Sequence, residues 1–263
     1  MSETKTTTYK IVIAYDGTNF KGWQRGNGRT VQATLEEALS QALADDPETG
    51  VVPPDISIDG AGRTDAGVHA EGQVASLVLP GSVKPGFLRE ALNEVLPSDL
   101  AVLSVDAVDD RFHARYRATA KTYRYRVIDG PSGDPFLRRF SWRLRETMDV
   151  DRMRAAAEVF TGRHDFAAFT ADKGKKDKTR TIRSLLVERN KTPCGSSLDI
   201  VFHGDGFLWK QVRIITAGLT LCGTGETDAA TLNDVLRSGD RSRAPGPAPA
   251  RGLTLVSVEY QGG

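Results

Sequence analysis

The order of the apolar segments constrains the fold more than any other feature of this chain. Residues 9–14 alternate between apolar and polar side chains, as in a strand with one buried face, and residues 31–43 have apolar residues at helical spacing after Thr30, a possible N-cap. The segments that follow are two strands, a helix and a strand, at 56–59, 73–79, 86–96 and 101–106. The order β-α-β-β-α-β predicts a split βαβ arrangement, with an antiparallel sheet and helices on one face.

The second half of the chain has a similar order of segments, although no sequence repeat accompanies it. Its segments are strands at 119–127, 140–143, 182–188, 197–203 and 253–260 and helices at 151–160, 207–221 and 229–236. We therefore expect an α/β (α+β) fold of two βαββαβ-like halves, residues 1–110 and 111–263. They would form a mixed, mainly antiparallel sheet with helices on one face and a central active-site cleft.

The net charge of +1 conceals an uneven distribution along the 263 residues. Residues 1–110 contain 17 acidic and 8 basic residues, whereas residues 111–263 contain 17 acidic and 27 basic residues. An acidic half joined to a basic half predicts a polyanionic partner that is held mainly by the second half.

Two clusters concentrate the basic charge. Residues 111–126, RFHARYRATAKTYRYR, contain six basic residues and no acidic one, with aromatic rings between them, and residues 173–183, KGKKDKTRTIR, contain six basic residues and one acidic. Either cluster alone is also compatible with a solvated strand or loop face. Basic residues interleaved with rings are typical of RNA binding, and we expect RNA contacts from Arg115, Lys175, Lys176 and Arg180.

Other features argue against several function classes. The two cysteines, Cys194 and Cys222, have no CxxC spacing, which favours a reduced, cytoplasmic setting, and the apolar run after the polar N-terminus is too short for a signal peptide or a membrane span. The four histidines are scattered, and no GxxxxGK[ST] motif occurs. We expect no metal, no nucleotide cofactor and no membrane partner.

The segment GAGRTDAGVHA, residues 60–70, almost matches the GxGxxG motif of dinucleotide-binding folds. Asp65 occupies the third glycine position, where a carboxylate would repel a pyrophosphate, and the following segment predicts a strand instead of the required helix. Alone, the sequence Asp-Ala-Gly is more typical of a turn. The arginine two residues earlier, Arg63, favours another interpretation, because a carboxylate beside a guanidinium stays ionised, as a nucleophile or base requires.

Several segments together resemble the tRNA pseudouridine synthase A family over nearly the whole chain. GAGRTDAGVHA is similar to the family's catalytic motif, and YDGTNFKGWQR with TVQATLEEAL is similar to its N-terminal signature. RFHARYRATAKTYRYR resembles the strand that carries the family's active-site tyrosine. FLWKQVRIITAG is similar to the family's helix that carries an arginine, and APARGLTL is similar to its C-terminal motif.

The resemblance implies isomerisation of uridine to pseudouridine in the anticodon stem-loop of tRNA, at nucleotides 38 to 40, by a homodimer that uses no cofactor. It implies Asp65 as the catalytic aspartate, Tyr123 as the ring that stacks on the target base and Arg213 as the basic partner of the aspartate. Attack by Asp65 on C1′, attack on C6, and stabilisation of positive charge on the sugar all stay open. Arg63 is expected to fill the space left by the flipped base, and Thr64 and His69 to contact the substrate.

One motif departs from the bacterial pattern. Trp209-Lys210-Gln211 stands where bacterial members more often have a smaller aromatic residue or histidine and then methionine, which leaves the choice of nucleotides open. A non-catalytic RNA-binding protein is the main alternative, but the octapeptide of the RNA-recognition motif is missing. A small-molecule α/β enzyme is disfavoured by the basic half and by the missing phosphate and metal motifs.

Overall fold

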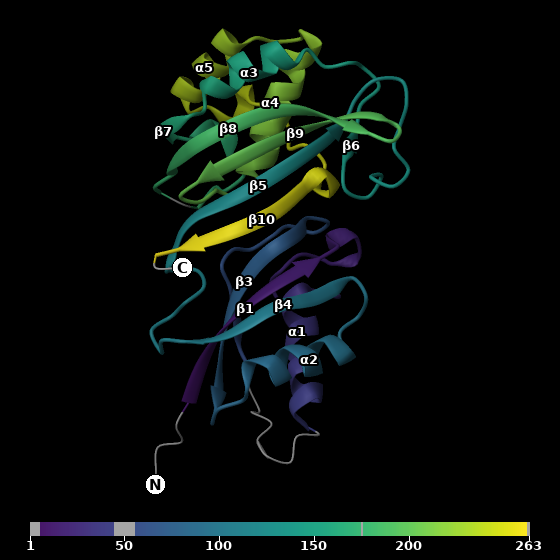
Figure 1. Ribbon diagram of the computed structural model, residues 1–263. Helices are drawn as coiled ribbons and strands as arrows, with labels where there is room; N and C mark the ends of the chain where they lie inside the picture. Colours follow the sequence, from purple (N-terminus) through teal and green to yellow (C-terminus); the bar gives the residue numbers. More distant parts are fainter. Residues whose placement is uncertain (1–5, 45–55, 175, 262–263) are drawn as a thin grey trace. The chain divides into compact units, whose positions relative to one another are not determined.

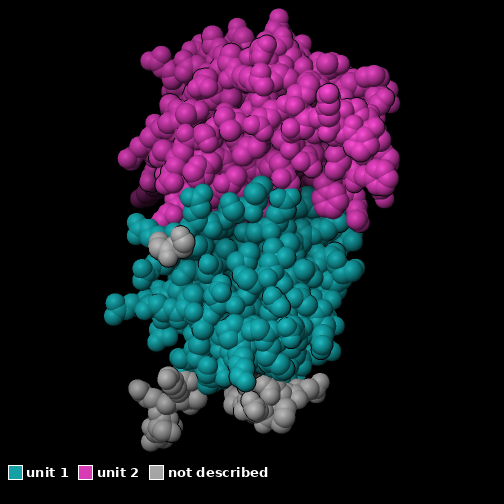
Figure 2. All heavy atoms as spheres, viewed as in Figure 1, with its two compact units in different colours: residues 1–118, 256–263 teal, residues 119–255 magenta. Residues whose placement is uncertain are grey.

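The structure is a computed structural model that describes residues 6–44, 56–174 and 176–261. The chain forms two compact units, residues 1–118 with 256–263 and residues 119–255 (Figure 2). The expected mixed, mainly antiparallel α/β fold is confirmed, whereas the expected cleft stays a prediction.

The first unit has the predicted β-α-β-β-α-β order (Figure 1). Its elements are β1 (Thr6–Tyr15), the 3-10 helix η1 (Gly17–Asn19), α1 (Val31–Ala44), β2 (Ile58–Gly60), β3 (His69–Pro80), α2 (Pro85–Val95) and β4 (Leu100–Val108). β1 pairs in antiparallel fashion with both β3 and β4, and β2 pairs with β3. Tyr9, Ile11 and Ile13 are buried and alternate with less buried residues, as expected for a strand with one face in the core.

The start of α1 and the start of β3 show what local patterns predict and what they miss. Thr30 Oγ1 accepts a hydrogen bond from the Ala33 N–H at 3.4 Å, in agreement with the predicted N-cap. β3 begins at His69, inside the glycine-rich motif, and not at Gln73. The motif therefore links two paired strands, with Gly60 opposite Ala75.

The last strand, β10 (Leu253–Tyr260), contributes its final residues to the first unit. A Cβ at Gly72 would lie 2.5 Å from the Val256 carbonyl oxygen, so the two backbones approach closely there. The Tyr260 hydroxyl donates to the Ala114 carbonyl oxygen at 2.8 Å, and its ring packs on Phe112 with a centroid distance of 5.1 Å. These contacts join residues at the C-terminal end to the segment that follows β4.

The second unit repeats the strand and helix order with additions. Its elements are β5 (Ala118–Ile128), β6 (Trp142–Arg143), α3 (Val150–Glu158), β7 (Gly162–Asp165), η2 (Ala167–Phe169), β8 (Thr179–Thr192), β9 (Gly195–Gly204), α4 (Gln211–Thr224), α5 (Ala229–Ser238), η3 (Arg241–Arg243), η4 (Ala250–Gly252) and the start of β10. The strand order β5-β9-β8-β7 is antiparallel, and β6 adds to β5 in parallel. α3 contacts α4, α5 and β8 (Figure 1).

Two details of this unit differ from the sequence-based expectation. β7 was not predicted, because its four residues, GRHD, have no apolar alternation. α4 begins at Gln211 and not at Phe207, because Lys210 adopts a left-handed conformation with φ of 59°, and the Gln211 N–H donates to Leu208 O at 3.0 Å in a turn before the helix.

Candidate active site

The loop between β2 and β3 carries Asp65 at a tight turn. The Val68 N–H donates to the Asp65 carbonyl oxygen at 3.1 Å, and Gly67 adopts a φ of 78° to close the turn. The Asp65 side chain is half-buried and that of Arg63 is exposed. The turn that the sequence indicated is therefore present, and the loop carries a carboxylate and an exposed guanidinium.

A distant segment, residues 16–32, packs against this loop and fixes its backbone. The Trp23 N–H donates to the Thr64 carbonyl oxygen at 3.1 Å, and the Gly67 N–H donates to the Phe20 carbonyl oxygen at 3.3 Å. Trp23 itself is only 2% exposed. The N-terminal signature and the glycine-rich motif therefore form one structural unit, although about forty residues separate them in the sequence.

Two glycines permit this close approach of the two segments. Gly22 has a φ of 100°, and a Cβ there would lie 2.8 Å from the Thr64 carbonyl oxygen. A Cβ at Gly17 would lie 1.9 Å from the Val68 carbonyl oxygen. Any larger residue at either position would push the backbone next to Asp65 out of place.

Tyr15 and Thr64 form a buried hydrogen bond behind the loop. Their hydroxyl oxygens are 2.8 Å apart, and both side chains are nearly inaccessible to solvent. Burial raises the pKa of Tyr15 to about 12, with the Thr64 hydrogen bond acting in the opposite direction. Nearby, Gln73 Nε2 donates to the Gly62 carbonyl oxygen at 2.8 Å. Thr64 therefore supports the loop, and its expected contact with the substrate stays a prediction.

His69 anchors the start of β3 to η1. The Gly17 N–H donates to His69 Nδ1 at 3.0 Å. Asp16 Oδ1 lies 3.2 Å from the same nitrogen and accepts from the Thr18 N–H and hydroxyl. The side chain is buried, so the structure gives His69 a supporting role, and its expected contact with the substrate also stays a prediction.

In the second unit, Tyr123 lies on β5 among other aromatic side chains. It pairs in register with Phe202 on β9, and its ring meets that of Phe207 edge to face at a centroid distance of 5.3 Å. Tyr123 is 8% exposed. The ring is therefore held in a defined orientation by its neighbours, and its expected contact with the target base stays a prediction.

Arg213 lies in the first turn of α4 and is bound to the proline-rich loop before β10. Its Nε donates to the Ala248 carbonyl oxygen at 2.7 Å, and the Ala248 N–H donates to the Arg213 carbonyl oxygen at 3.0 Å. The Tyr125 hydroxyl donates to Pro249 O at 2.7 Å in the same region. Burial raises the pKa of Tyr125 above its usual range, and the charges of Arg213 and Arg251 oppose this shift.

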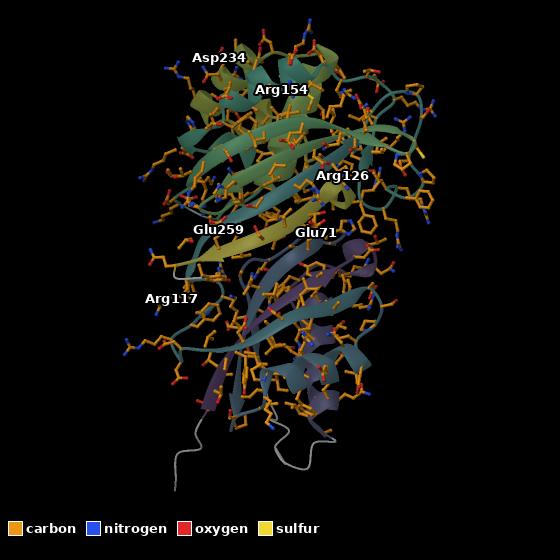
Figure 3. All side chains as sticks on the ribbon, viewed as in Figure 1. Glu71, Arg117, Arg126, Arg154, Asp234 and Glu259 are labelled. Atoms are coloured by element: carbon orange, nitrogen blue, oxygen red, sulfur yellow. The ribbon has the colours of Figure 1, made fainter. Side chains whose placement is uncertain are left out.

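The other predicted RNA-binding residues occupy different surfaces. Arg115 is exposed between β4 and β5, in a segment whose Arg117 extends from the ribbon in Figure 3. Lys176 is exposed before β8, and Arg180 on β8 is half-buried, opposite His164 of β7. Lys175 lies outside the described residues.

Not every basic residue of the first cluster is directed to solvent. Arg126, labelled in Figure 3, forms a two-pronged ion pair with Asp199 of β9, with both hydrogen bonds 2.7 Å long. Arg124 lies 4.0 Å from the same carboxylate. These two side chains stabilise the sheet, so the cluster divides into the exposed residues Arg111, Arg115 and Arg117 and a paired portion on β5.

The predicted residues therefore fall into two sets. Asp65, Arg63, Thr64 and His69 share one loop and the strand after it in the first unit, which also contains Arg115. The second unit contains the other set, which is Tyr123 on β5, Lys176 before β8, Arg180 on β8 and Arg213 on α4. Within the described ranges, no three His, Cys, Asp or Glu side chains gather as they would around a metal ion, and no helix is long and apolar enough to cross a membrane.

The supporting residues Tyr15, Gly17, Gly22 and Gln73 were not singled out by the sequence. Tyr15 continues the alternation of buried residues on β1, so its burial was indicated by the strand pattern. Its bond to Thr64, 49 positions away, has no local signal.

Comparison with known proteins decides the family. A family model described as tRNA pseudouridine synthase matches residues 11–117 and 156–261. The chain belongs to the tRNA pseudouridine synthase family. The first matched range of this chain contains Asp65 and the second contains Arg213, whereas Tyr123 lies between the two ranges.

Individual members of this family match almost the entire chain. The tRNA pseudouridine synthase A of Limosilactobacillus reuteri (strain DSM 20016) is 41% identical over 254 residues, which are 96% of each chain. That of Bacillus sp. (strain KSM-64) is 41% identical over 96% of this chain and 99% of its own, and that of Thermoanaerobacter sp. (strain X514) is 36% identical over 95% and 98%. The resemblance inferred from the motifs is confirmed.

Proposed function

We propose that this chain isomerises uridine to pseudouridine in the anticodon stem-loop of tRNA, at nucleotides 38 to 40, with Asp65 as the catalytic carboxylate. Membership of the tRNA pseudouridine synthase family supports the reaction. The observation that carries the role of Asp65 is its loop, whose backbone is bound to the segment 16–32 and whose turn is closed at Val68. A carboxylate on a fixed backbone is preorganised for attack on a bound nucleotide.

The reaction rearranges one nucleotide and requires no second substrate. The N1–C1′ bond breaks, the uracil rotates, and C5 bonds to C1′. The hydrogen on C5 then leaves as a proton, and N1 gains a proton, so the product is an isomer of the substrate. Asp65 would act on the sugar or on the base, by attack on C1′ or C6 or by stabilising positive charge at C1′.

The other residues have roles that fit this chemistry. Tyr123 would hold the detached uracil against its ring and place its hydroxyl near the proton that leaves C5. Arg213 would keep Asp65 ionised and oriented. Arg63, exposed on the Asp65 loop, would enter the space that the flipped nucleotide leaves in the stem.

Four basic residues would bind the rest of the tRNA. Arg115, Lys175, Lys176 and Arg180 would contact phosphates, and Thr64 and His69 would hold the loop that meets the nucleotide. We further propose that the enzyme is a cytoplasmic homodimer that holds tRNA across both subunits and uses no metal or nucleotide cofactor. The shift of charge toward the second half of the chain supports a polyanionic substrate.

The decisive experiment follows tritium release from tRNA labelled at uridine C5. Wild-type protein should release tritium, and Asp65→Asn should lower the rate by about a thousandfold or more while it still binds tRNA. Asp106→Asn, an exposed aspartate on β4, is the matched control and should keep full activity. Undiminished release by Asp65→Asn would overturn the role of Asp65, and tight tRNA binding without release by the wild type would identify a non-catalytic RNA-binding protein.

The position of the reaction needs a second measurement. Transcripts in which uridine 38, 39 or 40 is replaced by cytidine, one at a time, should each lose the tritium release that belongs to that nucleotide. Release that persists when all three are replaced would contradict the assignment to these positions.

A further inference from the structure

Trp209 is an exposed aromatic residue close to buried side chains in the sequence. Its side chain is 53% exposed, whereas Leu208 before it and Gln211 after it are buried. Another tryptophan of the chain, Trp23, is 2% exposed. An indole contributes little to a core when half of it faces water, so the exposed half of the Trp209 ring is accessible to a ligand.

The backbone that carries Trp209 is rigid. Its carbonyl oxygen accepts two hydrogen bonds, from the Ala171 N–H and from the Thr170 hydroxyl, both at 3.0 Å. The next residue, Lys210, is the only non-glycine residue with positive φ in the part of the chain that the structure describes. Such a conformation costs on the order of 1 kcal/mol and persists where the surroundings impose it. The indole is therefore presented from a fixed base, which lowers the entropic cost of binding to it.

A positive charge lies beside the ring. Lys210 Nζ lies 4.6 Å from the centroid of the Trp209 ring, within the range of a cation–π contact. Lys173 is exposed and follows Ala171 by two residues, so its backbone lies within about 7 Å of the residue that binds the Trp209 carbonyl. An aromatic ring beside an ammonium group, with a second exposed lysine close by in the chain, matches a nucleotide, which offers a flat base and a phosphate. A protein partner with an apolar surface would cover the ring but would not neutralise the lysine charges, so it fits this site less well.

We propose that Trp209 stacks on an unpaired base of the tRNA substrate, with Lys210 and Lys173 near the adjoining phosphates. This inference rests on the proposed function and adds a substrate-positioning residue to it. The base would cover the part of the ring that solvent now reaches. Because Trp209 is four residues before Arg213, binding there would hold the RNA next to the N-terminal end of α4.

The test compares three substitutions at this position. Trp209→Ala and Trp209→Leu should each weaken tRNA binding by about tenfold and raise KM by a similar factor with little change in kcat, whereas Trp209→Phe should retain most of the affinity, since stacking requires a ring and not only apolar area. Leu186→Ala, which removes another exposed apolar side chain in the same unit, is the control and should bind as the wild type does. Equal affinity of the wild type and Trp209→Ala would overturn the proposal, as would equal loss in Trp209→Phe and Trp209→Leu.

Fluorescence gives an independent measurement. Addition of tRNA should protect the emission of the wild type from acrylamide, and the protected component should be absent from Trp209→Phe. An unchanged tRNA affinity with an altered molar mass of Trp209→Ala would assign the ring to contact with a second copy of the chain and overturn the proposal. Failure of the proposal leaves tritium release by the wild type intact, whereas failure of the proposed function abolishes that release.

Discussion

The Asp65 loop and the basic segment before β8, which begins at Lys173, are held in different ways. Contacts from distant parts of the sequence fix the Asp65 loop, through Trp23, Phe20 and Tyr15. The basic segment contains short-range bonds, in which Asp172 accepts from the Gly174 N–H and Asp177 accepts from the Thr179 N–H. Reaction at a carbon atom requires a carboxylate within a few tenths of an ångström of its place, whereas charge attracts phosphates over several ångströms. The difference predicts that substitutions around Asp65 affect stability and kcat, and that those in the basic segment affect tRNA affinity alone.

The largest loss of stability is expected from Gly17→Ala. The new Cβ would lie 1.9 Å from the Val68 carbonyl oxygen, so the backbone on one side must move. We expect the free energy of unfolding in urea to fall by about 3 kcal/mol, and kcat to fall at least tenfold. Gly86→Ala is the control, because a Cβ at Gly86 meets nothing within 4 Å. Equal urea midpoints for the two variants would show that the close approach of Gly17 to Val68 does not fix the Asp65 loop.

The second-largest loss of stability is expected at alkaline pH, from the ionisation of Tyr15. The pKa of Tyr15 is raised to about 12 in the folded state, whereas an unfolded tyrosine titrates near 10. Between these values the unfolded state has lost a proton that the folded state keeps, so the free energy of unfolding falls by about 1.4 kcal/mol per pH unit on account of Tyr15.

Tyr15→Phe should lack this contribution. Urea unfolding of both proteins at pH 9 to 12 should show the wild type losing its advantage over Tyr15→Phe as the pH rises above 10. Tyr116→Phe, at an exposed position, should leave the wild-type pH dependence unchanged. Parallel curves for the wild type and Tyr15→Phe would show that this hydroxyl is not buried behind the loop.

A smaller loss is expected from Thr64→Val, which preserves shape and removes one hydroxyl. The Tyr15 hydroxyl would lose its hydrogen bond of 2.8 Å with Thr64, at a cost of about 1.5 kcal/mol in the free energy of unfolding. The double variant with Tyr15→Phe should be less destabilised than the sum of the two single variants. Strict additivity would mean that the two hydroxyls do not interact, and would weaken the account of how the loop is fixed.

The smallest effect on stability is expected from Lys173→Gln combined with Lys176→Gln. Both side chains are exposed, so the free energy of unfolding should change by less than about 0.5 kcal/mol. The dependence of tRNA affinity on salt should become shallower, with the slope of log K against log salt reduced by about 1.5. Lys191→Gln, at an exposed position on β8, should leave the slope unchanged. A marked loss of stability would show that the basic segment is as tightly held as the Asp65 loop.

The sequence predicts those features that have a local cause. The β-α-β-β-α-β order follows from the periodicity of apolar residues, and the position of Asp65 between two strands follows from its turn residues. The start of α4 was predicted too early, because the left-handed conformation of Lys210 depends on tertiary contacts. The bonds from Trp23 and Tyr15 to Thr64 join residues about forty or more positions apart, and no local pattern records them. The motif thus singles out Asp65, and the structure shows which distant residues hold its loop.

The return of β10 to the first unit has a consequence for biosynthesis. Tyr260 bonds to Ala114 and packs on Phe112, and Val256 closes on Gly72 of β3. At about 5–20 residues per second, the ribosome needs on the order of ten seconds to travel from residue 118 to residue 256. During this interval Gly72 lacks its close contact with Val256, whereas Leu77, Ser76 and Ala75 of β3 can already pair with β2. The Asp65 loop directly precedes β3, so the contacts that the first unit makes with β10 form only after that strand has been made.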